Sequence, residues 1–568
     1  MSVSPDQAAA GPSIAETVLT PELALAALQL IVLLFLIRSI LYGLGRLIGA
    51  AHPAWYRWWP RTGARTLIRF VAAITRWREM VFRLGKVSTA GLASPAFVST
   101  YLYRPGRFHL GRIWAAGFGW LQPVGIDVSR HLFFMAQTGA GKTTAVISMI
   151  SLWAGSAFII DPKGQITYAL ARHDRDRRWV VIEPYGKQSA AYNAFDTIKH
   201  AMAEQGDGIA VLWAFRIAEA LIVTPEGSRS PFFTNSARGF LAALILHVLT
   251  TLPPSQHNLI TVRRLLVEGV RVHREDGTEE PTTEEERHEL LYMAMSNNTA
   301  FNGAVSGGVS AIKNAAGETA GNVRATLNEQ TKWLDIPQVH PVLSSTDLPP
   351  HLLKTLDDVV LSLVLPVLSV REELAPLARL LTNMMGYAFQ DERTKKGQCL
   401  AVIDELPAQG HNAALEVMIP VARSQGLTVL GISQNIELLR AAYPKTYNIF
   451  LGEADAVLWS GINHKETSEH LSSLLHKRTL VKKDAYSGEL SYRDVDVLSP
   501  DQVRRFLDPN SGNLIVTRAG GRAFRLKNDP YYKALPVWRY APDPDHKEAF
   551  LRRLTRRLFD SNRPGGQT

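Results

Sequence analysis

The chain has 568 residues, more than one compact domain usually holds, so we expect two or three domains. A hydrophobic content of 46% permits large cores, and a single cysteine, Cys399, excludes an internal disulfide framework and a cysteine-rich metal site. The net charge of +10 is concentrated in residues 38–86, which hold ten bases and one acid; residues 1–37 hold three acids and no base, which leaves +4 for residues 87–568. It is therefore a weak indication of nucleic-acid binding.

The first predicted element is a transmembrane helix over residues 22–48. Apart from Gln29 and Arg38, residues 23–45 are largely apolar, close to the roughly 20 residues that cross a bilayer. The tail before it, residues 1–21, has no Lys or Arg, so the positive-inside rule places that tail outside the cytoplasm and the rest of the chain inside. A signal peptide fits less well, because the tail has no positive charge. A buried core helix remains an alternative.

A basic juxtamembrane region and linker, residues 49–110, follows. Its aromatic cluster at 55–59 suits the membrane interface. Residues 67–84 are a possible second span, but their four arginines favour a basic interfacial helix. Residues 87–110 are punctuated by Gly, Ser and Pro and indicate a linker.

From residue 131 the pattern becomes strand, turn, helix and strand. The expected elements are a strand at His131–Ala136, a helix at Thr143–Leu152, and strands at Ser156–Ile160 and Trp179–Ile182. This alternation is typical of a parallel α/β sheet.

Residues 213–335 are helical in character. Thr234, Asn235 or Ser236 can cap a helix through Phe240–Leu249, a run that is too short to span a membrane and indicates a core helix. Thr283 and Glu286 have the spacing of a capping box. Strand-like runs resume at the following positions: Val359–Leu365, Leu400–Ile403, Thr428–Ile432 and Ala456–Trp459. The sequence thus predicts one α/β domain interrupted by an all-α insertion.

A Walker A loop lies between the first strand and its helix: Ala136, Gln137, Thr138, Gly139, Ala140, Gly141, Lys142, Thr143 and Thr144. The glycines let backbone N–H groups turn toward phosphate oxygens, and the following helix directs its positive dipole end there. Lys142 is expected to contact the β- and γ-phosphates of ATP, and the Thr143 hydroxyl to bind Mg²⁺.

A Walker B strand, 400–405, delivers two carboxylates to the edge of the sheet where ligands bind. Asp404 is expected to hold Mg²⁺ and Glu405 to polarise the attacking water. Two weaker candidates follow. Gln434 ends a strand and is suited to contact the γ-phosphate, and Arg423 could act as an arginine finger or be an ordinary solvated helix-end residue.

The ordered motifs resemble the type IV secretion coupling proteins, the TraG/TraD-like conjugation ATPases. The likeness covers about 120–540 and includes, besides the Walker segments, these stretches: Asp161-Pro162-Lys163-Gly164, Tyr192-Asn193-Ala194-Phe195-Asp196, Pro231-Phe232-Phe233, Ser433-Gln434, Leu498-Ser499-Pro500 and Pro530-Tyr531-Tyr532. The sequence departs from the family at Ala136, usually Gly, and at Gln165, usually Glu.

The resemblance implies a RecA-like P-loop NTPase domain, residues 111–212 and 336–540, around an all-α domain at 213–335, with a C-terminal tail at 541–568. It implies a hexameric ATPase at the bacterial inner membrane with its ATPase domain in the cytoplasm. The family commonly has two membrane spans with a periplasmic loop, whereas this sequence predicts a single pass. It also implies type IV secretion channel components as partners, and relaxase-bound single-stranded DNA or effector proteins as cargo. Arg423 becomes a finger acting on a neighbouring subunit, and Lys445 and Lys465 become interface candidates.

Two alternative functions share the same site. One is an FtsK/HerA-like DNA translocase, which the size of the helical insertion makes less favoured. The other is a non-hydrolytic adaptor that recruits secretion substrates, which Glu405 argues against, because a purely structural site has no use for a water activator.

Overall fold

The computed structural model describes residues 91–114, 121–224, 231–271, 282–313, 317–366, 373–391, 397–483 and 490–542, together with 553, 555 and 556. The predicted transmembrane helix, the basic region up to residue 90 and almost all of the C-terminal tail lie outside the described residues.

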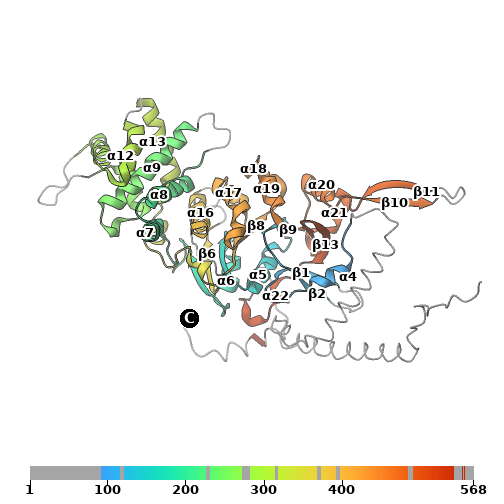
Figure 1. The fold of residues 1–568 in the computed structure, drawn as a ribbon. Helices are drawn as coiled ribbons and strands as arrows, with labels where there is room; N and C mark the ends of the chain where they lie inside the picture. Colours follow the sequence, from blue (N-terminus) through green and yellow to red (C-terminus); the bar gives the residue numbers. More distant parts are fainter. Residues whose placement is uncertain are drawn as a thin grey trace, which may run out of the picture.

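A mixed sheet forms the centre of the described part (Figure 1). Its strand order is β2-β1-β13-β12-β9-β3-β8-β7-β4-β6-β5. The strands are β1 (Phe108–Trp114), β2 (Leu121–Ile126), β3 (His131–Ala136), β4 (Ser156–Asp161), β5 (Arg178–Ile182), β6 (Val359–Val364), β7 (Cys399–Ile403), β8 (Leu427–Ser433), β9 (Ala454–Ser460), β12 (Asn513–Arg518) and β13 (Gly521–Lys527).

The run from β9 to β5 is parallel, as predicted, and every strand that the sequence predicted lies in it. Strands covered on both faces appear in a sequence as continuous apolar runs. In β3, Leu132 and Phe134 belong to the apolar core beneath α5 (Lys142–Leu152), whereas Phe133 and Met135 belong to the core on the opposite face.

The antiparallel edge formed by β1, β2, β12 and β13 was not predicted. The prediction of a linker at 87–110 is therefore wrong for its described part. Residues 95–101 form α4 (Pro95–Val98) and a 3-10 turn, and β1 begins at Phe108. These strands mix apolar residues with Arg, Lys and Gly, so they carry a weaker hydrophobic signal than the parallel strands.

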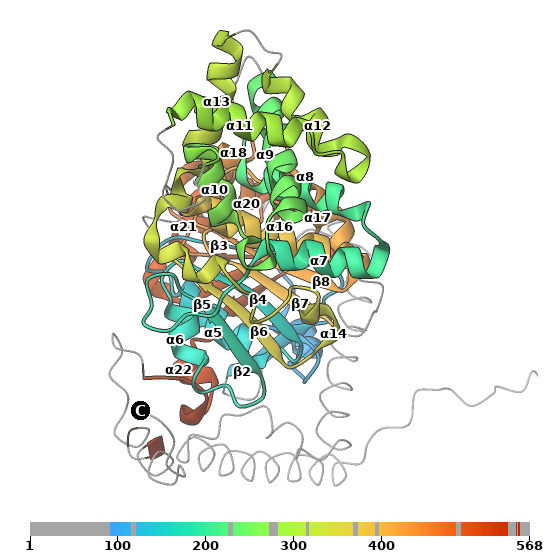
Figure 2. The same ribbon diagram turned by 90° about the vertical axis from the view of Figure 1, so that its left-hand side faces the viewer.

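The helical insertion lies at one end of the sheet (Figures 1 and 2). Its helices are α7 (Ala194–Gln205), α8 (Ile209–Leu221), α9 (Phe232–Thr251), α10 (Leu259–Glu268), α11 (Glu284–Ser296), α12 (Ala300–Lys313) and α13 (Gly317–Thr331). Helical structure thus begins earlier than the predicted boundary at 213. The capping box of Thr283 and Glu286 at the start of α11 is confirmed.

Helix α9 begins before its predicted cap. Pro231 is the N-cap residue, so Thr234, Asn235 and Ser236 lie within the helix rather than in front of it. By length and composition α9 could cross a membrane. Its residues from Phe240 to Val248 are nevertheless buried among the neighbouring helices, as expected for a core helix.

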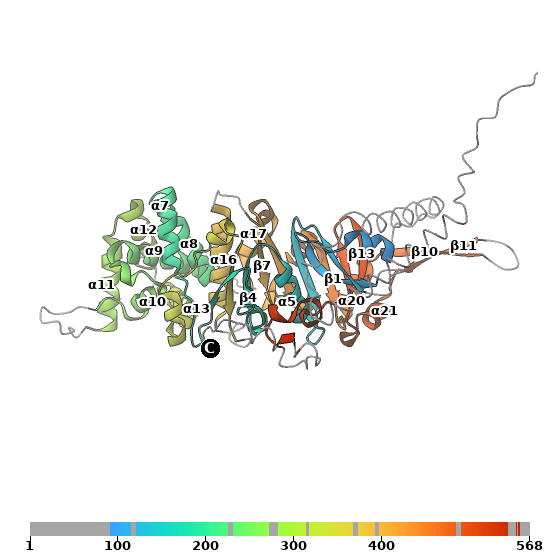
Figure 3. The same cartoon turned by 90° about the horizontal axis from the view of Figure 1, so that it is seen from below.

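The chain returns to the sheet through α14 (Leu352–Thr355) and β6. Helices α16 (Ala375–Asp391) and α17 (Ala413–Ala422) then flank the sheet. At the end opposite the insertion, strands β10 (Lys477–Lys483) and β11 (Leu490–Asp496) form a projecting hairpin (Figures 1 and 3).

Two consecutive glycines in α12 test the packing of the insertion. A Cβ at Gly308 would lie 2.4 Å from the Cβ of Ala243 in α9, whereas a Cβ at Gly307 would meet nothing within 4 Å. We expect Gly308→Val to lower the free energy of unfolding by about 1–3 kcal/mol through overpacking. Gly307→Ala, the matched control, should be neutral or stabilising by roughly 0.5–1 kcal/mol. Thermal unfolding of the two variants measures the difference, and equal effects would contradict the close approach of α9 and α12.

Candidate nucleotide site

The predicted Walker A residues form a turn between β3 and α5. Ala136 ends the strand and Lys142 begins the helix. Gly139 and Gly141 have φ angles of 85° and 75°, a region that favours glycine, and a Cβ at Gly139 would face open space. The turn therefore presents backbone N–H groups and the first turn of α5 to the same space, an arrangement suited to an anion such as a phosphate group.

Residues that follow β13 and β9 also contact the Walker A turn, although nothing in their sequence predicts these contacts. The Asn528 side chain, which follows β13, donates hydrogen bonds to the Ala140 carbonyl and the Ser460 hydroxyl, each at 3.1 Å. A Cβ at Gly461 would lie 2.3 Å from the Cβ of Ala140, so the end of β9 must also be close to the loop. Neither contact has a local sequence signal.

Lys142 lies against the two acids that follow β7. Its Nζ is 3.4 Å from Asp404 Oδ1 and 3.5 Å from Glu405 Oε1. All three residues are buried. Segments more than 250 positions apart therefore meet, because β3 and β7 are both paired in parallel with β8 and end at the same edge of the sheet.

Gln434 completes this cluster. Its Nε2 donates to both carboxylate oxygens of Glu405, at 2.9 and 3.0 Å. Glu405 itself has φ 57° and ψ 50°, a left-handed conformation that is unusual for a residue with a side chain. Such strain is typical of functional sites, and here it accompanies a carboxylate held between Lys142 and Gln434.

A third acid, Asp161, lies at the end of β4, the strand next to β7. One oxygen, Oδ2, accepts hydrogen bonds from the Thr167 N–H at 2.8 Å and the Thr167 hydroxyl at 2.9 Å. Burial raises the pKa of Asp161 to about 6; the Thr167 hydrogen bonds oppose the shift, and the charge of Asp404 adds to it. Asp161 belongs to one of the stretches that resemble the family, but its sequence context predicts no role for it.

The remaining predicted residues lie apart from Lys142. Arg423 begins a 3-10 turn, Arg423–Gln425, after α17. Lys445 is exposed. Lys465 is exposed at the start of α20 (Lys465–Leu474) and is 3.9 Å from Glu469. The fold therefore assembles Lys142, Asp404, Glu405 and Gln434 within one chain, and it does not bring Lys445 or Lys465 into that cluster.

The cluster fits a magnesium-bound triphosphate. Asp404 Oδ1 is buried and, among the described residues, has no hydrogen-bond partner beside its contact with Lys142. The described residues contain no group of three His, Cys, Asp or Glu side chains that could hold a metal ion alone. Mg²⁺ commonly binds through one or two protein groups, several waters and substrate phosphates, which is the role that Thr143 and Asp404 could fill.

Comparisons with known proteins agree with this geometry. A family model described as type IV secretory system conjugative DNA transfer matches residues 84–557. The conjugal transfer protein TraG of Rhizobium radiobacter is 25% identical over 358 residues, which cover 61% of this chain and 52% of that protein. A TraG protein of Escherichia coli is 24% identical over 462 residues, covering 71% and 67%. The chain thus spans about half the length of the first relative.

Solved structures share the fold. The bacterial conjugative coupling protein TrwBdeltaN70 is similar with a TM-score of 0.58 and 15% identity, over 81% of this chain and 96% of that one. TrwB in complex with ADP and Mg²⁺ has a TM-score of 0.57 and the same identity, over 81% and 98%. The similarity confirms the predicted RecA-like P-loop fold.

Asp161→Asn is expected to stabilise the fold at neutral pH. In the wild type the pKa of Asp161 is about 6 in the folded chain against 3.8 for an ordinary aspartate, so ionisation of this buried carboxyl lowers the free energy of unfolding. This loss is absent below pH 3.8, grows as the pH rises and is complete above about pH 6. It amounts to at most about 3 kcal/mol. Asparagine keeps an oxygen that accepts from Thr167. The melting temperature of the variant should exceed that of the wild type near pH 7.5, and the gap should shrink near pH 4.5. A gap that does not change with pH would contradict a buried, costly carboxylate.

Proposed function

The chain belongs to the type IV secretory system conjugative DNA transfer family, and from this premise we propose that it is an ATP-driven coupling protein. In this role it recruits relaxase-bound single-stranded DNA or effector proteins and feeds them to a type IV secretion channel. The observation that carries the ATPase part is the convergence of Lys142, Asp404, Glu405 and Gln434 at one sheet edge.

Each residue of the cluster has a chemical task. ATP with Mg²⁺ supplies the phosphoryl group and the positive charge that neutralises its oxygens. Lys142 contributes a compact charge at the phosphates, and the Thr143 hydroxyl and the Asp404 carboxylate hold the metal. Glu405 orients a water and accepts its proton, and Gln434 fixes the direction of the Glu405 carboxylate through two hydrogen bonds. The loop amides from Ala136 to Thr144 bind the remaining phosphate oxygens.

The proposal includes a membrane anchor. Residues 22–48 would cross the inner membrane once, with the ATPase domain in the cytoplasm. The support is compositional: an apolar run is followed by a basic flank.

A ring of subunits, with six as the expected number, would place Arg423 at a neighbouring site. It follows α17, where Val417 is 72% exposed and Val421, one turn later, is 48% exposed. An exposed apolar stripe on a helix is suited to bury itself against another subunit. Arg423 at its end would then face the phosphates bound next door, and Lys445 and Lys465 would contact the same neighbour.

Glu405→Gln tests the hydrolytic function. The amide keeps the size of the side chain but cannot accept the proton from water, so we expect kcat to fall by about 100-fold or more while ATP still binds. Steady-state hydrolysis and binding of a fluorescent ATP analogue measure the two quantities. If hydrolysis is lost while substrate export continues, a non-hydrolytic adaptor is the better description.

Mixing two inactive variants tests Arg423. Arg423→Ala subunits keep Glu405, and Glu405→Gln subunits keep Arg423, so mixed rings contain some complete sites if the arginine acts between subunits. We expect each variant alone to be inactive and the mixture to regain part of the ATPase rate. A mixture as inactive as its components would place the role of Arg423 within its own subunit.

A further inference from the structure

Helix α16 carries a buried cation that the hydrolysis cluster does not use. Arg379 is 9% exposed, and within the described part of the chain no carboxylate pairs with it. Burial lowers its pKa to about 10, so it stays charged at neutral pH. Burying a guanidinium without a counter-ion costs free energy of folding. The hydrogen bonds that Arg379 makes therefore indicate why it is buried there.

Within the described ranges, Arg379 donates two hydrogen bonds, and both go to backbone carbonyls in different parts of the molecule. Its Nε donates to the carbonyl of Ala220 at 3.2 Å, and its Nη1 donates to the carbonyl of Gln409 at 2.9 Å. Ala220 is in the last turn of α8, where carbonyls lack helical partners and a cation is favourable. Gln409 ends the 3-10 turn Leu406–Gln409, which starts directly after Glu405.

The turn makes two backbone hydrogen bonds, from the Ala408 N–H to the Glu405 carbonyl and from the Gly410 N–H to the Pro407 carbonyl. The Gln409 side chain is 1% exposed, and neither its Oε1 nor its Nε2 has a hydrogen-bond partner among the described residues. Gly410 follows with φ 70°. Further along, Asn412 Nδ2 donates at 2.8 Å to Asn383, one turn after Arg379 on the same face of α16. Helix α16 is therefore one of the elements that position the segment after Glu405, and Arg379 and Asn383 provide its hydrogen bonds to that segment.

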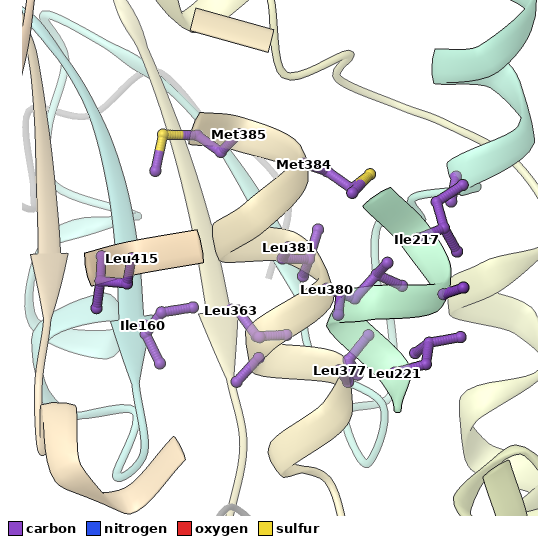
Figure 4. Packing of buried hydrophobic residues seen from close by; sticks show 14 of the residues in the cluster. Ile160, Ile217, Leu221, Leu363, Leu377, Leu380, Leu381, Met384, Met385 and Leu415 are labelled. Carbon is purple, nitrogen blue, oxygen red and sulfur yellow. The ribbon is translucent and has the colours of Figure 1, made fainter. Parts of the chain in front are cut away.

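On its other side α16 packs tightly against the insertion. Figure 4 shows Ile217 and Leu221 of α8 beside Leu377, Leu380 and Met384 of α16, while Ile160 and Leu363 of the sheet lie on the opposite side. At the far end of this contact, Arg216 of α8 pairs with Asp391 at 2.5 Å. Close-packed interiors have low compressibility and transmit strain. A displacement of α16 is therefore expected to displace α8.

We infer that Arg379 is a positioning residue that couples the Glu405 turn to the all-α insertion. The inference rests on the proposed ATPase function. A triphosphate competes with Asp404 and Glu405 for Lys142, and a positioned water competes with Gln434 for Glu405. The resulting displacement of the turn changes the bond between Gln409 and Arg379, and through Ala220 it alters the end of α8.

Hydrogen exchange on the full chain tests this coupling. The amides at the C-terminal end of α8 are followed with and without the non-hydrolysable ATP analogue ADPNP and Mg²⁺, so the readout does not require hydrolysis. In the wild type we expect the analogue to change exchange at 217–222. Arg379→Met, which keeps an unbranched apolar side chain and removes the guanidinium with both hydrogen bonds, should abolish that change while ADPNP still binds.

The matched control is Arg216→Met, which breaks an ion pair in the same helix contact without touching the Glu405 turn. It should change baseline exchange of α8 and preserve the response to ADPNP. Arg379→Lys, which keeps the charge and can reach one carbonyl at a time, should give a partial response and lower kcat about 10-fold with KM unchanged. It also covers the case in which Arg379→Met fails to fold.

Three outcomes separate the possibilities. A nucleotide response that survives in Arg379→Met and Arg379→Lys overturns the coupling role. A wild-type chain that binds ADPNP without any change at 217–222 overturns it as well. Failure of the wild type to bind ADPNP overturns the proposed ATPase function itself.

Discussion

The contact of Lys142 with Asp404 and Glu405 depends on how the sheet is wound. Strand β8 pairs in parallel with β3 on one side and with β7 on the other, so the lysine-bearing turn and the acid pair finish at the same edge. A one-residue slip of either pair would turn its side chains to the opposite face. In the observed register Leu132 lies opposite Leu430 and Ile403 lies opposite Gly431, and the apolar side chains of all three strands pack into the cores on the two faces of the sheet. The chemistry of the site therefore rests on apolar strand packing.

Much of this arrangement could be predicted from the sequence because two signals coincide. Buried parallel strands give uninterrupted apolar runs, and the Walker residues follow them directly, so His131–Ala136 was correct to the residue. Strand β13, which pairs with β1 and β12 and contains Arg522 and Arg525, alternates polar and apolar residues only weakly and is not predicted by the sequence. Asn528 could not be assigned a role, because its partners Ala140 and Ser460 are distant in sequence. Asp161 bonds to the nearby Thr167, but its position beside Asp404 depends on the pairing of β4 with β7.

The site concentrates unfavourable features that a stable fold would avoid. Glu405 adopts a strained backbone conformation, Asp161 is a buried acid with a raised pKa, and Arg379 is a buried cation with carbonyl partners alone among the described residues. The insertion shows both kinds of behaviour: the capping box at Thr283 follows the usual rules, whereas Phe301 and Asn302 in α12 have left-handed backbone conformations.

The insertion is attached to the ATPase fold close to α16, the helix that carries Arg379. The chain leaves the sheet after β5 and returns through α14, so two connecting segments join the insertion to the ATPase fold. On the outgoing side α8 contacts α16. On the returning side the buried Lys354 donates to the carbonyl of Phe389 in α16 at 2.6 Å and to Gln425, beside Arg423, at 3.4 Å. Helix α16 thus contacts α8 of the insertion and, through Lys354, the returning segment, and the turn after Glu405 lies against it. A movement of α8 relative to the nucleotide therefore acts on α16, because α8 and the turn after Glu405 share that helix as a neighbour.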